Sequence, residues 1–452
     1  MSKTIYLKKG LDIPVSGAAA QKTGKSVAGG IVAVKPTDFK GIIPKLLVRE
    51  GDTVEAGTPL FADKLKPEIL FCSTVSGTVR EIVRGEKRKL LEVRIESDGA
   101  GRHVDFGIRN IGGMNAGEIR DALLKSGLWP AIIQRPYGTV ADPAVKPKAI
   151  FVSAFSTAPN AAVPEYALKD EFRNIQTGVD ALSALTDGGV HFSLNSENCL
   201  GTPFHKIENV IQHTFSGKHP AGNVGVQIHH ISPIRKGETV WTVSLLMLAA
   251  IGKLFNTGKF DLSRKVAVTG PCAKNPCYVD ATAGMSMKDI AEYCDDSAGE
   301  VRFISGDVLT GTNVGPDGFL GFYDNQVSLL KEGREFEMLG WAKPFRTNLF
   351  SASRAYFSWL TPKKRYDMDT NTHGGERAFV MSDVYGKVLP MKLFPVHLIK
   401  ACMAGNIDKM EELGIYEVIG EDIALCEFVC PSKIEWIAAL ENGIDTMLKE
   451  MA

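Results

Sequence analysis

The stretch IPKLLVREGDTVEAGTPLFAD, residues 43–63, decides how the first part of the chain folds. Its short apolar segments are separated by turns at Gly51 and Gly57, a pattern typical of short strands joined by tight turns. A second unit of the same kind, STVSGTVREIVRG, occupies residues 73–85, and its apolar side chains alternate with polar ones as in half-buried strands. Two quasi-repeated hairpins of this kind predict a flattened barrel-sandwich over residues 1–97.

Beyond a polar, glycine-rich linker at residues 98–115, strands and helices alternate along the chain. Apolar residues spaced three and four apart predict helices, and short continuous apolar runs predict buried strands. The expected elements are a helix over 116–127, a strand over 148–155, a helix over 171–189, strands over 190–195 and near 224–231, and a helix over 243–258. This alternation predicts a Rossmann-like α/β layer with a parallel sheet over residues 98–260.

Two further regions complete a multidomain α/β protein. Residues 261–340 follow the order strand, turn, strand, short helix, strand, which resembles the β-grasp fold of soluble-ligand-binding domains. Residues 341–452 hold aromatic-rich segments that predict strands and turns as far as about Pro390, followed by a C-terminal helical region. The helices expected there cover 395–404, 408–413 and 432–449.

Charge and hydropathy exclude several classes of protein. Lys and Arg together number 52, as do Asp and Glu, so the basic excess that nucleic-acid binding requires is missing. The longest apolar stretch, residues 241–252, is too short to cross a bilayer, and the first residues do not resemble a secretory signal. We therefore expect a soluble cytoplasmic chain whose eight cysteines stay reduced.

Two lysine-containing motifs suggest cofactors, and both fit poorly. Gly24-Lys25-Ser26 ends like a nucleotide-binding P-loop, but Ala19 stands where the first glycine of that motif is required. The first module resembles biotinyl and lipoyl domains, and Lys64 lies where such domains carry their modified lysine. The KLKPEILF segment that begins there is long and apolar for the hairpin tip of a swinging arm. A structural module without lipoate or biotin is therefore favoured, and a carrier module is the alternative.

Cysteine and histidine spacings do not predict a metal site. Cys426 and Cys430 form a short pair, whereas zinc and iron–sulfur sites usually need four ligands. The histidines between residues 205 and 230 lack HExxH or HxH spacing. His229 and His230 are expected on a strand, where adjacent side chains face opposite sides and cannot easily share one metal.

One irregular segment carries side chains suited to bind a flat ring. Trp129 and Tyr137 offer aromatic surface for stacking, while Arg135 and the tyrosine hydroxyl offer hydrogen-bond donors for ring carbonyls. A quinone or a flavin is such a ligand. The alternative interpretation is that this segment only packs between two domains. The loop at His219 and Gly222 is a second candidate near the same site.

An ordered set of motifs resembles the NqrA family, the peripheral subunits of Na⁺-translocating NADH:quinone reductases. The set includes KKGLDIPVSG at 8–17, SGLWPAIIQRPY at 126–137, KAIFVSAFSTAPNAA at 148–162, GEVRFISGDVLTGT at 299–312 and ALCEFVCPSK at 424–433. No single motif decides the matter, but together they run through nearly the entire chain in order.

The resemblance implies a peripheral location on the cytoplasmic face of a bacterial inner membrane, in a complex that oxidises NADH, reduces quinone and exports Na⁺. It implies that this subunit binds quinone but has no catalytic residue, metal or cofactor of its own. NADH, flavins and iron–sulfur clusters would belong to other subunits, and its partners would be those subunits, especially the membrane subunits. The family is distantly similar to the NADH-binding subunit of complex I, yet SGLWPAII replaces the flavin-binding glycine loop and only Cys426 and Cys430 remain of a cluster motif. A stand-alone flavin NADH dehydrogenase is the remaining alternative.

Overall fold

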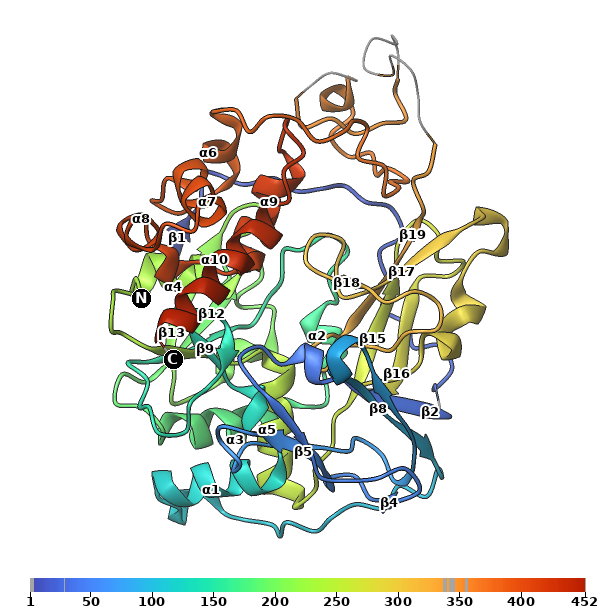
Figure 1. Cartoon of the computed structure of the whole chain (residues 1–452), viewed down its shortest axis with the longest axis vertical. Helices are drawn as coiled ribbons and strands as arrows, with labels where there is room; N and C mark the ends of the chain where they lie inside the picture. Colours follow the sequence, from blue (N-terminus) through green and yellow to red (C-terminus); the bar gives the residue numbers. More distant parts are fainter. Residues whose placement is uncertain (1–3, 28, 336–339, 341–345, 354–356, 452) are drawn as a thin grey trace.

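The computed structural model describes the chain except for residues 1–3, 28, 336–339, 341–345, 354–356 and 452. It shows a barrel-sandwich module, an α/β module, a smaller β module and a set of C-terminal helices (Figure 1). The predicted fold class is therefore confirmed.

The barrel-sandwich consists of two small antiparallel sheets. The first contains, in order, β2 (Ile31–Val34), β8 (Leu90–Ser97), β7 (Gly77–Arg84) and β4 (Thr53–Val54), and the second β3 (Pro44–Leu46), β5 (Pro59–Asp63) and β6 (Leu70–Cys72). The stacked rings of Phe61 and Phe71, with centroids 4.7 Å apart, lie in its core. Gly77 is required because a Cβ there would lie 2.0 Å from the carbonyl oxygen of Glu96.

The α/β module is built on a seven-stranded sheet. Its strands lie in the order β1 (Thr4–Tyr6), β13 (Ile211–Ser216), β12 (Val190–Asn195), β11 (Ile150–Ser153), β14 (Val240–Thr242), β9 (Ile133–Arg135) and β10 (Thr139–Val140). The first five are parallel, as predicted, and β9 is antiparallel to both neighbours. The first strand of the chain thus belongs to this sheet and not to the barrel-sandwich that follows it in sequence.

Two helices, α3 (Phe172–Ser183) and α5 (Leu245–Thr257), pack closely against one another in this module. Glycines make the close packing possible, because a Cβ on Gly252 would lie 1.7 Å from the carbonyl oxygen of Asn174. Both helices lie where they were predicted, but α3 ends at Ser183, six residues before the predicted end at 189. Ser244 caps α5 through a hydrogen bond from the backbone amide of Met247 to its side chain.

The strand expected near 224–231 is wrong, because these residues form the helix α4 (Val224–Ile231) next to β11. A short continuous apolar run does not distinguish a buried strand from a buried helix. The strand that precedes α5 is β14 instead. His229 and His230 therefore lie on a helix, with ring centroids 5.3 Å apart, and do not face opposite sides of a strand.

The third module has a five-stranded sheet and a short helix. Its strands lie in the order β16 (Cys277–Thr282), β15 (Ser263–Thr269), β19 (Gln326–Lys331), β17 (Val301–Ser305) and β18 (Thr312–Asn313). The 3₁₀ helix η6 (Met287–Tyr293) follows β16. The predicted elements occur in the predicted order, and two strands that were not predicted, β18 and β19, follow them.

The C-terminal region is helical. It contains α6 (Val384–Val388), α7 (Pro395–Met403), α8 (Ile407–Glu412), α9 (Gly420–Phe428) and α10 (Trp436–Met451). Three of these helices, α7, α8 and α10, were predicted within a few residues, whereas α6 and α9 were not. The strands expected as far as Pro390 are not found: the described residues of 346–390 form turns, α6 and the 3₁₀ helix η9 (Ser358–Leu360).

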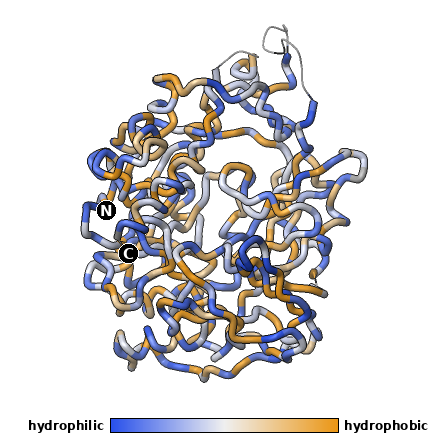
Figure 2. Tube along the Cα trace, viewed as in Figure 1, coloured by the Kyte–Doolittle hydropathy of each residue, from blue (hydrophilic) through white to orange (hydrophobic). Residues whose placement is uncertain are grey.

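Three clusters of buried side chains hold these modules together. One is shared by the barrel-sandwich and one side of the α/β module, a second by the other side and the C-terminal helices, and a third fills the β-grasp-like module. Apolar residues are accordingly spread along the trace, as Figure 2 shows. Among the described residues, no helix has both the length and the apolar character needed to span a membrane.

Candidate functional site

The Trp129 side chain lies inside the protein. After α1 (Ala116–Ser126) the chain turns through the 3₁₀ helix η4 (Trp129–Ala131) and enters β9. The indole is fully buried, and its Nε1 donates a hydrogen bond to the carbonyl oxygen of Ala141 at 2.8 Å. The ring meets Trp241 edge to face, with centroids 5.4 Å apart. Neighbouring residues of the protein thus enclose the indole and engage its hydrogen-bond donor.

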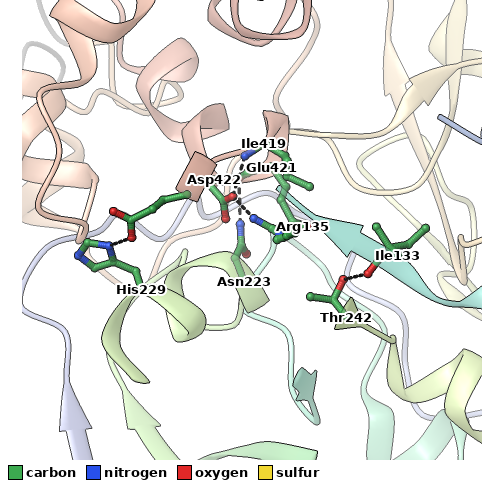
Figure 3. A network of polar contacts seen from close by, with 9 residues as sticks. Ile133, Arg135, Asn223, His229, Thr242, Ile419, Glu421 and Asp422 are labelled. Carbon is green, nitrogen blue, oxygen red and sulfur yellow. Dashed lines mark hydrogen bonds and ion pairs between the residues drawn. The ribbon is translucent and has the colours of Figure 1, made fainter. Parts of the chain in front are cut away.

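Arg135, at the end of β9, forms a buried ion-pair network with α9 (Figure 3). Its side chain is 1 % exposed, its Nη1 donates to Asp422 Oδ2 at 2.6 Å, and its Nη2 pairs with Glu421. Asp422 also accepts a hydrogen bond from the backbone amide of Ile419, at the start of α9. The guanidinium therefore joins the central sheet to the C-terminal helices.

Although 36% of the Glu421 side chain is exposed, its partial burial controls the charge of the carboxyl in this network. It raises the pKa of Glu421 to about 7, and it outweighs the opposing attraction of Arg135. The neighbouring Asp422 carboxylate, which adds repulsion, acts in the same direction as burial. The network thus carries a carboxyl that changes protonation near neutral pH.

Tyr137 follows two residues later and is also buried, at 5 % exposure. Its ring meets Tyr416 edge to face, with centroids 6.1 Å apart. Its backbone has a φ of 80°, in the left-handed region that few non-glycine residues adopt. Trp129, Arg135 and Tyr137 thus point to different neighbours and do not form one open surface in this conformation.

The loop with His219 and Gly222 is held against the end of β11. His219 Nδ1 lies 3.2 Å from Thr157 Oγ1, which accepts a hydrogen bond from the Gly222 amide at 2.9 Å. Ser153 Oγ donates to the Gly222 carbonyl at 3.0 Å. Burial lowers the pKa of His219, so its imidazole stays neutral at pH 7.

This loop and Arg135 meet at α9, which sequence reasoning did not anticipate. Asn223, directly after the loop, donates through its side-chain amide to the Glu421 carbonyl at 2.9 Å. On the same side, His229 Nδ1 lies 2.6 Å from Glu417 Oε2. The adjacent acids in the sequence GED at 420–422 were a usable signal for a helix start.

A cavity of about 790 Å³ lies where the barrel-sandwich, the α/β module and the β-grasp-like module meet. One wall is apolar and comes mainly from α5 and its surroundings, with Val75, Leu168, Leu246, Met247, Ala249 and Ala250. The rest of the lining mixes glycines, small residues and charged residues, and two pairs of the charged residues are closed ion pairs: Lys253 with Asp261 at 2.6 Å, and Lys265 with Asp280 at 2.7 Å.

Arg264, on β15, is the buried cation of this cavity lining. It is 6 % exposed, and its guanidinium donates to backbone carbonyls, among them that of Phe322 at 2.8 Å. Its Nη2 is buried and has no hydrogen-bond partner among the described residues. Burial lowers the pKa of Arg264 to about 10, so the group is still charged at pH 7.

Possible metal and cofactor ligands are scattered. Among the residues that the structure describes, no group of three or more His, Cys, Asp or Glu side chains is placed to hold a metal ion. Cys426 and Cys430 are buried thiols, and burial raises the pKa of Cys426 to about 12. The Cys430 sulfur lies 3.3 Å from the Tyr385 hydroxyl. Lys64 is exposed at the start of the loop between β5 and β6.

Family models match three parts of the chain. The model described as the NqrA N-terminal barrel-sandwich hybrid domain matches residues 5–98, and the NqrA second alpha/beta domain matches residues 114–260. The model described as the NQRA C-terminal domain matches residues 265–315. These ranges cover most of the three sheet-containing modules, although β1 falls mainly in the first range and β19 lies beyond the third.

Relatives align over nearly the full length. The NqrA subunit of the Na(+)-translocating NADH-quinone reductase of Vibrio vulnificus is 38% identical over 451 residues, covering 99% of this chain and 100% of the relative. The corresponding subunit of Rhodopirellula baltica is 36% identical over 450 residues and covers 98% of each chain. Among solved structures, an NAD⁺-reducing [NiFe]-hydrogenase aligns with a TM-score of 0.36 and 12% identity, covering 75% of this chain and 64% of that chain.

Proposed function

Because the chain belongs to the NqrA family of Na⁺-translocating NADH-quinone reductases, we propose that it is the peripheral quinone-binding subunit of such a complex. The complex would couple NADH oxidation and quinone reduction to Na⁺ export, with this chain at the cytoplasmic face of the membrane. NADH, flavins and iron–sulfur clusters would be bound by other subunits. This chain would contribute a binding site and no catalytic residue of its own.

The cavity between the three modules carries the quinone-binding part of the proposal. Its volume of about 790 Å³ falls in the range of small-molecule sites, and ligands favour interfaces between domains. A quinone head is a flat, weakly polar ring with two carbonyl acceptors. The apolar wall of α5 suits the ring, and Arg264 and Lys253 are hydrogen-bond donors of the right kind for the carbonyls.

The hypothesis that Trp129, Arg135 and Tyr137 bind the quinone ring stays a prediction. In this conformation the indole donor and the guanidinium are engaged by protein groups. Binding there would require Arg135 to leave Asp422, and breaking a buried pair is costly because the carboxylate is then left uncompensated. Binding in the cavity would need smaller changes, because the Lys253–Asp261 pair is partly exposed and Arg264 Nη2, although buried, has no partner among the described residues to give up, so we favour the cavity.

Photoaffinity labelling separates the two sites. The complex would be illuminated with an azido-substituted quinone, with and without an excess of unlabelled quinone, and the modified peptides of this chain mapped. The cavity predicts labels in residues 245–265, in α5 and the start of β15. Labels confined to residues 129–137 would favour the buried segment. Labelling that excess quinone does not suppress would contradict quinone binding by this subunit.

A further inference from the structure

A second feature of the chain is the composition of the sequence segment 341–366. This stretch of sequence contains six Lys and Arg residues, seven aromatic residues and no Asp or Glu, although the net charge of the chain is zero. Clustered basic residues interleaved with Trp, Tyr and Phe are typical of segments that lie at a membrane surface.

The described part of this segment exposes large apolar side chains. Phe357, Trp359 and Leu360 are 44%, 51% and 61% exposed. They belong to the tight turn of η9, which is closed by a hydrogen bond from the Leu360 amide to the Phe357 carbonyl at 2.9 Å. The buried Ser358 anchors the turn, because its hydroxyl accepts a hydrogen bond from the Ser351 amide at 3.2 Å. The turn therefore leaves about half of the surface of these apolar side chains exposed.

Three consecutive cations, Lys363, Lys364 and Arg365, follow the turn and are exposed. Two of them are held in place: Lys364 Nζ donates to the Thr347 carbonyl at 2.7 Å, and Arg365 Nη1 to the Val15 carbonyl at 3.1 Å. Within the described residues, none of the three pairs with a carboxylate. Their positive charge is therefore available to an external anion.

The apolar surface continues onto the C-terminal helices. Phe428, at the end of α9, is 38% exposed, and its ring stacks on Phe350 with centroids 6.5 Å apart. Figure 1 shows residues 357–380, in orange, at one end of the molecule, above α9 and away from the barrel-sandwich. One end of the protein therefore presents aromatic residues beside a positive cluster.

We propose that this basic aromatic face, defined by Phe357, Trp359, Leu360, Lys363, Lys364 and Arg365, rests directly on the surface of an anionic bilayer. The aromatic side chains would enter the boundary between headgroups and acyl chains, where Trp and Phe are favoured. The three cations would contact lipid phosphates, which carry the negative charge of the cytoplasmic leaflet. Lipid contact by a protein without a spanning helix among its described residues goes beyond the proposed function and does not depend on it.

Charge complementarity favours lipid over a protein partner as the occupant. A bilayer surface is flat and uniformly anionic, so it can contact three adjacent cations without requiring one fixed geometry. A specific protein interface would be expected to pair at least some of them with carboxylates in a fixed geometry. The aromatic residues at the end of a short turn resemble an interfacial anchor more than the broad core of a protein–protein interface.

Vesicle flotation tests the proposal with the purified full-length chain. Vesicles of phosphatidylcholine alone are compared with vesicles that also contain phosphatidylglycerol, at low and high salt. We expect flotation only with the anionic vesicles, and its loss at high salt because the charges are screened.

Tryptophan fluorescence provides a second signal. Trp129, Trp241 and Trp436 are buried, whereas Trp359 is exposed on the face. Brominated lipid should therefore quench part of the emission when the chain binds anionic vesicles, and Trp359→Ser should reduce the quenched part.

Variants test whether the residues of the basic aromatic face account for binding to anionic vesicles. Lys363→Glu combined with Lys364→Glu, and separately Trp359→Ser, should each weaken binding to anionic vesicles by about tenfold or more. The matched control, Lys8→Glu with Lys9→Glu, makes the same charge change at another exposed lysine pair, next to β1, and should bind like the wild-type chain. Circular dichroism and denaturation midpoints check that each variant is folded.

Two outcomes would overturn the proposal. One is absence of flotation with anionic vesicles, or equal loss in the control and the face variants. The other is wild-type vesicle binding in both face variants together with failed assembly with the membrane subunits, which would make this face a protein interface.

Discussion

The cavity around Arg264 and the network around Arg135 are two buried arginine sites with opposite chemistry. Arg135 is held by two carboxylates from α9, so its charge is compensated within the protein. Arg264 is held by neutral backbone carbonyls, and its Nη2 has no partner among the described residues. Of these two arginines, Arg264 is the one that lines the cavity. An arginine with carboxylate partners is committed to structure, whereas Arg264, held by carbonyls, keeps its charge and a buried donor without a partner, which a small movement of the lining would expose to a ligand.

The largest expected effect is on stability, at the Arg135 network. Arg135→Ala leaves Asp422 buried without its partner, and such a loss costs about 3–5 kcal/mol. Urea denaturation at pH 7 measures it. Arg120→Ala is the matched control, because this exposed arginine has only a surface neighbour in Asp121 and should lose about 1 kcal/mol or less. Equal losses in both variants would show that the network is not a structural anchor.

An effect on quinone affinity is expected at the cavity. Gly30 lies in the lining, and a Cβ there would meet no atom within 4 Å. Gly30→Phe should therefore fold normally but occupy part of the site, weakening quinone binding on the order of tenfold.

Gly113→Phe is the control for this variant, since Gly113 also has open space around its Cβ and lies outside the cavity. Titration of a short-chain quinone into the complex gives both affinities. If Gly30→Phe is folded and its quinone affinity is unchanged, the cavity is not the quinone site, and residues 129–137 become the favoured site.

The smallest expected effect is a difference in pH dependence between the two sites. The folded-state pKa of Glu421 is raised from 4.5 to about 7, so its contribution to stability is complete below pH 4.5 and is lost as the pH rises through 7. Wild type should therefore lose stability between pH 5 and 8 relative to Glu421→Gln. Denaturation curves at both pH values measure this difference.

The cavity should not share this pH dependence. Arg264, with a pKa of about 10, stays charged from pH 5 to 8, so quinone affinity should be flat over that range. If quinone affinity and protein stability change with pH in the same way, the two sites are coupled, and the prediction that they act independently is wrong.

Local patterns were sufficient to predict most elements of this fold. Glycine turns and alternating side chains located the barrel-sandwich, and the spacing of Ile175, Val179 and Leu182 located α3. The residues of α4 were misassigned because a short apolar run fits both a strand and a helix, and packing decides between them. The α9 helix was overlooked because its apolar residues surround it almost completely, leaving little amphipathic signal.

The candidate sites depended on contacts that local patterns do not contain. Arg135 was recognised as a donor, but its partner Asp422 is 287 residues away. The cavity draws its lining from three modules, and its residues form no motif in the sequence. Burial of Trp129 was likewise invisible, since an aromatic residue at a domain junction suits stacking with a ligand and packing equally well.

The position of β1 also limits when its sheet can form during translation. Thr4 to Tyr6 pair with Thr214 to Ser216, so the first strand of the chain completes a sheet whose neighbouring strand is translated about 210 residues later. At ~5–20 residues per second, the nascent chain would wait roughly 10 to 40 s before this pairing becomes possible. The strands of the barrel-sandwich can pair during that interval, while the segment that precedes them is still unpaired, although part of their core is shared with the α/β module. At this edge of the sheet, the strand that is translated first can pair only after a strand that is translated much later. The barrel-sandwich therefore leaves the ribosome before the segment that precedes it in sequence is paired.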